Sequence, residues 1–270
     1  MKTLYVSDLD GTLLRSDEHT SEFTNNTINN LVQKGMLFSY ATARSYSTSR
    51  KVTEGLNANI PLITFNGTII VDNCSGELIH KIFFGADANI ILEDLFRNDV
   101  FPIVYSFIDN VERFSFFSEK RTSGMIKFLN MRQGDKRTRI VNNETELKVG
   151  EIFYITCIDK EEKLHPLFIK YKDKYHCVYE KDIYTGEQWL EIMPQGASKA
   201  NAIKQLKEIL GCDYLVVFGD GTNDIDMFEI ADESYAVENA VDELKQIATG
   251  IIESNDKDGV ANLLISHVNK

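Results

Sequence analysis

Short apolar runs alternate with amphipathic stretches along the first part of the chain. Residues 4–7, 36–40 and 61–65 are rich in aliphatic and aromatic side chains, which favours strands. Between the first two of these runs, residues 21–34 carry apolar side chains at roughly helical spacing and end before Gly35, a residue typical of helix ends. Strands that alternate with helices predict βαβ units and a parallel sheet.

The pattern changes at about residue 85 and returns at about residue 190. The stretch between them predicts an α+β unit with enough apolar residues for a core of its own. Its elements are expected as helices at 88–96, 122–131 and 161–174 and as strands at 103–107, 113–117, 152–158, 176–179 and 189–192. We therefore expect an α/β fold in which residues 1–84 and 190–270 form one domain and residues 85–189 form an inserted second domain.

The alternating pattern then resumes towards the C-terminus. Ser198 can cap a helix over residues 199–210 that ends at Gly211. Residues 214–218 are almost entirely apolar, as is typical of a buried parallel strand. Further short elements are expected at 235–237, 241–248 and 259–268.

The composition fits a globular protein and excludes several kinds of partner. With a formal net charge of -12 over 270 residues, neither nucleic acid nor an anionic membrane is expected as a partner. No apolar run approaches the ~20 residues of a membrane span, and no signal peptide is expected from the few apolar residues before Asp8. The four cysteines are widely separated and do not have the spacing of zinc or redox motifs. We expect a cytoplasmic protein with reduced cysteines, and the sequence leaves its oligomeric state open.

Candidate chemistry lies where predicted strands end. Asp8 and Asp10 follow the first strand, Thr42 follows the second, and Asp220 follows the strand at 214–218, with Asp224 close behind. In an open parallel sheet, ligands bind outside the carboxyl ends of the strands, so these side chains are expected to meet in one crevice.

The same residue types suit phosphoryl transfer. Carboxylates such as Asp8 and Asp220 are ligands that Mg²⁺ prefers, together with substrate phosphate and water. The Thr42 hydroxyl and the Lys199 ammonium can hold phosphate oxygens and balance the negative charge of the transition state. Of the two opening acids, one is then free to act as a nucleophile and the other as an acid and base.

Longer motifs around these residues resemble a known family. DLDGTLL at the N-terminus, the turn at Thr42, the helix start at Lys199 and GDGTNDIDMF after residue 218 resemble the four ordered motifs of the haloacid dehalogenase (HAD) superfamily. NGTII, IMPQGASKANAI and the closing AVENAVDELKQIA and SNDKDGVANLL are similar to the Cof-like sugar-phosphate phosphatases. This resemblance implies a Rossmann-like catalytic core, and an α/β cap domain, here residues 85–189, that selects the substrate.

The resemblance also implies a role for each candidate residue. Asp8 would be the nucleophile that forms an aspartyl-phosphate, and Asp10 the acid and base. Mg²⁺ would be bound by Asp8, the backbone carbonyl of Asp10 and Asp220, with Asp224 as a ligand or as support. The phosphate would be bound by Thr42 and Lys199, with Asn223 positioning Lys199 or the phosphate.

Some positions depart from the family pattern or stay open. Ala43 and Ala200 stand where glycine is common in this group, but both are small and neither change removes a functional group. Asp224 could instead be an acid at a helix N-terminus, and Asn66 could serve the crevice or only the turn with Gly67. Arg44 is interpreted as a supporting or solvated residue rather than a phosphate ligand.

The predicted function is a Mg²⁺-dependent phosphatase that hydrolyses a small phosphorylated metabolite, such as a sugar phosphate, through an aspartyl-phosphate. Two alternatives remain at this point. A phosphotransferase or phosphomutase would use the same residues but pass the phosphoryl group to another acceptor. A non-catalytic regulator would bind a phosphorylated metabolite without turning it over.

Overall fold

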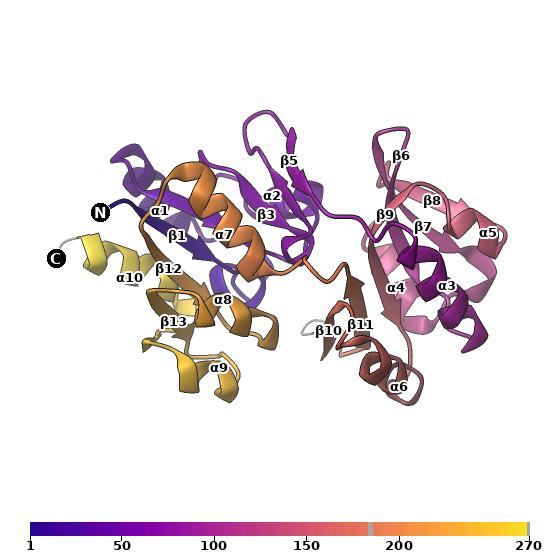
Figure 1. The fold of residues 1–270 in the computed structure, drawn as a ribbon. Coiled ribbons are helices and arrows are strands. Elements are labelled where there is room, and N and C mark those ends of the chain that lie inside the picture. Colours follow the sequence, from indigo (N-terminus) through magenta and orange to yellow (C-terminus); the bar gives the residue numbers. More distant parts are fainter. Residues whose placement is uncertain (183–185, 269–270) are drawn as a thin grey trace. The chain divides into compact units, whose positions relative to one another are not determined.

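The structure, a computed structural model, describes residues 1–182 and 186–268 (Figure 1). The chain divides into two compact units, Met1–Lys81 with Ser198–Lys270, and Ile82–Ala197. The division falls a few residues from the expected one, after Ala197 rather than at residue 190. The reason is that the last strand of the stretch, β11 (Gln188–Met193), pairs with strands of the second unit.

The first unit is built on a five-stranded sheet in which every neighbouring pair is parallel. In spatial order its strands are β14 (Gly250–Ile252), β13 (Glu233–Val237), β12 (Tyr214–Gly219), β1 (Thr3–Ser7) and β2 (Leu37–Tyr40). Both central strands, β1 and β12, are buried along almost their whole length, as parallel strands covered on both faces are. The parallel sheet predicted from the alternating pattern is therefore confirmed.

Helices and a small antiparallel sheet complete this unit. The helices are α1 (Glu22–Gln33), α2 (Tyr46–Val52), α7 (Lys199–Leu210), α8 (Ile225–Glu229), α9 (Asp242–Ile247) and α10 (Gly259–Val268). The small sheet consists of β3 (Leu62–Thr64), β4 (Ile69–Val71) and β5 (Leu78–Lys81). As predicted, the Ser198 hydroxyl caps α7, accepting from the Asn201 N–H, and α7 ends at Gly211 in a left-handed conformation (φ 61°).

The second unit is an α+β domain with a six-stranded sheet. Its strands in spatial order are β10 (His176–Lys181), β11, β9 (Glu151–Ile158), β6 (Ile103–Ile108), β7 (Val111–Phe117) and β8 (Thr138–Val141). The pairing is antiparallel except between β7 and β8. The helices are α3 (Asp87–Arg97), α4 (Ser123–Asn130), α5 (Glu144–Leu147) and α6 (Glu161–Tyr171).

This unit has its own hydrophobic core, as its apolar content predicts. Side chains from α3, α5 and α6 pack together with one face of the sheet, including Leu92, Ile155, Leu164 and Leu190. The strand β8 and the short helix α5 were not anticipated, because residues 138–147 mix charged and apolar positions without a clear period. Within the described part of the chain, no helix is both long and apolar enough to cross a bilayer. All four cysteines are free.

Candidate active site

Three loops of the first unit leave the sheet at the carboxyl ends of adjacent parallel strands. Asp8 directly follows β1, Asp220 directly follows β12, and Thr42 lies two residues beyond β2. Since β12, β1 and β2 are neighbours in the sheet, their carboxyl ends share one edge. The loops that carry Asp8, Asp220 and Thr42 therefore begin at one edge of the sheet.

The acid loop, which we define as Asp8–Leu14, touches the loop that carries Asp220. The Thr12 hydroxyl donates to Asp220 Oδ1 at 2.7 Å. Gly11 has a φ of 78°, and a Cβ at this position would lie only 2.3 Å from Asp220 Oδ2. Glycine is therefore required at position 11 both for the backbone turn and for the close approach of the two loops.

Lys199, the first residue of α7, joins two of the acids. Its Nζ lies 2.6 Å from Asp8 Oδ1 and 2.6 Å from Asp224 Oδ1, and its side chain is only 1% exposed. Burial alone would lower the pKa of Lys199, but the two carboxylates raise it above its ordinary value, so the ammonium stays charged. A buried cation thus sits beside the predicted nucleophile.

Asp224 is fully buried, and both of its carboxylate oxygens accept hydrogen bonds from the protein. Its Oδ1 accepts from Lys199, while its Oδ2 accepts from the backbone N–H groups of Asp220 at 3.0 Å and Gly221 at 3.1 Å. This geometry shapes the Asp220 loop and fixes the Lys199 ammonium.

Carboxylate oxygens of Asp8, Asp220 and Asp224 lie within 4.8 Å of one another. Burial raises the pKa of Asp8, with the Lys199 ammonium opposing the shift, and burial together with Asp224 raises the pKa of Asp220 to about 7. Clustered buried acids whose ionised forms are disfavoured fit a hard divalent cation, because the cation would neutralise them.

Asp10 pairs with Arg44, whereas Asp8 and Asp224 pair with Lys199. Arg44 Nε lies 3.0 and 2.8 Å from the two carboxylate oxygens of Asp10, and its Nη2 lies 2.6 Å from Asp10 Oδ1. The same Nη2 reaches Glu18 Oε2 at 3.1 Å, and the Arg44 backbone N–H donates to Thr42 Oγ1 at 3.1 Å. Arg44 is thus a supporting residue, as interpreted from the sequence, and it links Thr42 to Asp10.

Asn66 has a place both in the turn and beside the predicted site. It is buried and left-handed (φ 51°), and its N–H donates to the Thr42 carbonyl at 2.9 Å. Its Oδ1 lies 3.4 Å from Nδ2 of Asn223. The structure therefore places Asn223 next to Asn66. The two roles that the sequence left open for Asn66, one in the crevice and one in the turn with Gly67, are compatible.

One contact of this site was missed at the sequence level. Asp226 Oδ2 accepts from the N–H of Ala200 at 3.2 Å and so adds a second cap to the start of α7. The signal was present, because Asp226 lies inside the GDGTNDIDMF motif, but its spacing alone does not identify a helix elsewhere in the chain as its partner.

Gly67 supports the start of the same helix, and replacing it tests this support. A Cβ on Gly67 (φ 93°) would lie 2.1 Å from the Ser198 carbonyl oxygen, directly before Lys199. We expect Gly67→Ala to lower the free energy of unfolding by roughly 2 to 4 kcal/mol, as measured by urea denaturation. Gly35→Ala is the matched control, because Gly35 has a similar φ of 99° but open space around it. Equal losses in the two variants would show that contact with α7 is not responsible.

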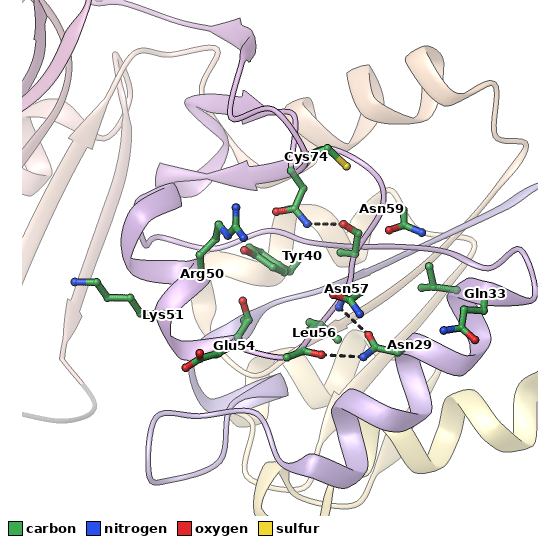
Figure 2. Close-up of a pocket in the computed structure, with 15 residues that line it drawn as sticks. Asn29, Gln33, Tyr40, Arg50, Lys51, Glu54, Leu56, Asn57, Asn59 and Cys74 are labelled. Atoms are coloured by element: carbon green, nitrogen blue, oxygen red, sulfur yellow. Dashed lines mark hydrogen bonds between the residues drawn. The ribbon is translucent and has the colours of Figure 1, made fainter.

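The same unit also has a polar hollow (Figure 2). It measures about 720 Å³ and is lined by parts of α1 and α2 and by the loop around Asn57. Its described lining includes none of the predicted site residues.

Comparisons with known proteins agree with this fold. A family model for haloacid dehalogenase-like hydrolases matches residues 5–264. The 5-amino-6-(5-phospho-D-ribitylamino)uracil phosphatase YitU of Bacillus subtilis is 28% identical over 269 residues, covering 97% of this chain and 96% of YitU.

Solved structures give the same picture. The structure of TM0651 from Thermotoga maritima has a TM-score of 0.78 at 26% identity, covering 98% of this chain and 97% of that one. The HAD subclass IIB sugar phosphatase BT4131 shares the fold with a TM-score of 0.79 at 18% identity, covering 99% of both chains. Because the family model spans nearly the whole chain, this protein belongs to the haloacid dehalogenase-like hydrolases, the family that its motifs resemble.

Proposed function

We propose that this protein is a Mg²⁺-dependent phosphatase that hydrolyses a small phosphorylated metabolite through an aspartyl-phosphate on Asp8. The observation that carries the proposal is the buried Lys199 ammonium held between Asp8 and Asp224, with Asp220 completing a three-acid cluster. A lysine and a divalent cation next to one carboxylate supply the positive charge that a phosphoryl group needs in an otherwise acidic protein.

The proposed reaction has two steps at phosphorus. An Asp8 oxygen attacks the phosphorus atom, the bond to the leaving oxygen breaks, and Asp10 gives that oxygen a proton. A water molecule then attacks the phosphorus of the aspartyl-phosphate, Asp10 takes the proton from the water, and Asp8 is released together with inorganic phosphate. Arg44 holds the Asp10 carboxylate by its guanidinium fork and so fixes its direction.

Metal and phosphate would be held by different groups of the site. Asp8, the backbone carbonyl of Asp10 and Asp220 would bind Mg²⁺, which when bound polarises the phosphoryl oxygens and neutralises charge. Asp224, whose two oxygens already accept hydrogen bonds from Lys199 and the backbone, is proposed to support the site rather than to bind the metal directly. Lys199, Thr42 and Asn223 would bind the phosphate.

Removing the metal tests its proposed role. We expect an excess of EDTA to abolish hydrolysis of an aryl phosphate and added Mg²⁺ to restore it. Chelation should also lower the melting temperature relative to the Mg²⁺-loaded protein, because the acid cluster then regains its mutual repulsion. Full activity after exhaustive chelation would contradict a metal-dependent mechanism.

Replacing Asp10 tests acid and base catalysis. We expect Asp10→Asn to lower kcat by about 10² to 10⁴ for an alkyl phosphate, because neither leaving oxygen nor water is then assisted by a proton transfer. The first step with an aryl phosphate should suffer less, since an aryl oxide leaves without a proton. Rapid-quench measurement of the two substrates separates these effects, and equal losses in the first step would argue against an acid role.

The substrate class can be tested by a screen of phosphorylated metabolites ranked by kcat/KM. Sugar phosphates belong in the screen, and so does the phosphorylated ribitylamino-uracil named for YitU, a relative at 28% identity. We expect release of inorganic phosphate equal to substrate consumed. Transfer of the phosphoryl group to an added sugar in place of this release would show a phosphotransferase, and absence of turnover with every substrate would favour a binding protein.

A further inference from the structure

Two asparagines outside the four motifs hold the acid loop by its backbone. Asn239 Nδ2 donates to the Gly11 carbonyl at 2.7 Å, and Asn255 Nδ2 donates to the Leu14 carbonyl at 2.9 Å. We call this pair the asparagine clamp. These two carbonyls lie at the two ends of residues 11–14, the part of the acid loop that follows Asp10. The clamp therefore restrains this segment at both ends.

The clamp is internally ordered. The backbone N–H of Asn255 donates to Asn239 Oδ1 at 3.1 Å, which turns the Asn239 amide so that its NH₂ group faces Gly11. Asn255 itself is buried, whereas Asn239 is exposed. The exposed donor therefore depends on the buried residue for its direction.

The turn that carries Asn239 also contacts the loop that carries Asp220. Val241, two residues after Asn239, donates its backbone N–H to the Asp220 carbonyl at 2.9 Å. One short turn, residues 239–241, thus contacts the backbone beside Asp8 and Asp10 and the backbone of Asp220. It fixes the spacing of the two loops whose acids form the predicted metal site.

The turn that carries Asn255 is anchored to the chain that follows the acid loop. Asp258, in a left-handed conformation (φ 55°), accepts from the hydroxyls of Ser21 at 2.7 Å and Thr24 at 3.1 Å and from the guanidinium of Arg15. Asp256 accepts from the Ser16 N–H at 2.8 Å. Asn255 therefore belongs to a turn that these hydrogen bonds hold in place.

We propose that Asn239 and Asn255 are positioning residues that set the geometry of the acid loop, and through it the placement of Asp8 and Asp10 relative to Asp220. The proposal rests on the proposed function for its catalytic consequence, but its structural part does not. Catalysis is sensitive to such placement, because a displacement of about 1 Å can lower turnover by about 10²-fold.

The chain offers a matched control in Asn29. Its Nδ2 donates to the Gly55 carbonyl at 2.8 Å and its Oδ1 accepts from the Asn57 N–H at 2.7 Å, the same two bonds that Asn239 makes (Figure 2). Asn29→Ala therefore removes equivalent hydrogen bonds in the same unit without touching an acid loop. Asn239→Ala and Asn255→Ala are compared with it.

Two measurements test the proposal. Hydrogen exchange followed by mass spectrometry should show faster exchange in a peptide spanning residues 8–14 for Asn239→Ala and Asn255→Ala, and no change there for Asn29→Ala. With an aryl phosphate and saturating Mg²⁺, kcat should fall by about 10- to 100-fold in the clamp variants while KM changes much less, and Asn29→Ala should keep the wild-type kcat.

The outcomes are separable. Unchanged exchange in residues 8–14, or a loss of kcat no larger than in Asn29→Ala, would overturn the positioning role. Equal acceleration of exchange over the whole first unit would also overturn it, because the asparagines would then contribute only to general stability. If the wild-type protein hydrolyses no phosphate ester, the exchange pattern still decides the role of the clamp, and only the proposed function fails.

Discussion

The Asp8→Asn variant is expected to lose essentially all turnover, by about 10⁴-fold or more. An amide is not a nucleophile towards phosphorus, so no aspartyl-phosphate can form, and the amide also removes a charged oxygen from the acid cluster. The loss should appear in kcat with every substrate, measured as phosphate released under saturating Mg²⁺. Near-normal hydrolysis by this variant would refute the covalent mechanism.

A folding control accompanies this variant. The amide oxygen can still accept from Lys199 Nζ, which lies 2.6 Å from Asp8 Oδ1 in the native protein, so we expect Asp8→Asn to keep the native circular dichroism spectrum. Asp173→Asn, an exposed aspartate of the second unit, controls for the general effect of removing one carboxylate. It should retain full turnover.

The Lys199→Met variant is expected to lose both stability and turnover. Methionine fills the space but leaves the buried Asp8 and Asp224 carboxylates without their shared cation, and breaking a buried ion pair in this way costs about 3 to 5 kcal/mol. Turnover should fall as well, since the ammonium proposed to bind the phosphate is lost. Urea denaturation and initial rates measure the two effects, and Lys204→Met, an exposed position on the same helix, is the control.

The stability loss of Lys199→Met should depend on pH in a defined direction. Burial already raises the pKa of Asp8 in the folded protein, and the lysine opposes that shift, so its removal raises the pKa further. A group with a raised folded-state pKa stabilises the fold below that pKa and loses this contribution as the pH rises through it. The difference in unfolding free energy between wild type and variant should therefore grow as the pH rises through the raised folded-state pKa of Asp8 in the wild-type protein. A pH-independent difference would show that lost packing, rather than unpaired charge, is the cause.

The parallel sheet and the meeting of its loops could be predicted because both follow from local patterns. Apolar runs such as residues 214–218 indicate buried strands, and the carboxyl ends of adjacent parallel strands share an edge whatever the loops contain. The gathering of Asp8 with Asp220 then follows from topology. Lys199 was expected near them only because its ammonium suits phosphate and its helix start resembles a HAD motif.

Other features depend on contacts between distant segments and have no local signal. Arg44 could not be assigned to Asp10 from sequence, because the turn after β2 determines where its guanidinium points. Asn239 and Asn255 lie inside the closing family-like stretches, but their partners could not be identified from sequence, since Gly11 and Leu14 lie more than 200 residues away. A strand was expected at 189–192, but the predicted domain boundary at residue 190 cut through it. The sheet that β11 joins is decided by its partner strand, and residues 189–192 alone do not identify that partner.

Trapping the covalent intermediate tests the central claim most directly. The Asp10→Asn variant, mixed with an aryl phosphate and Mg²⁺, should transfer the phosphoryl group without needing an acid but then hydrolyse the intermediate slowly. Acid quenching, digestion and mass spectrometry should find one phosphoryl group on the peptide that contains Asp8, together with a burst of aryl alcohol. A burst with the phosphoryl group on another residue, or with an Asp8 peptide that carries none, would contradict the account.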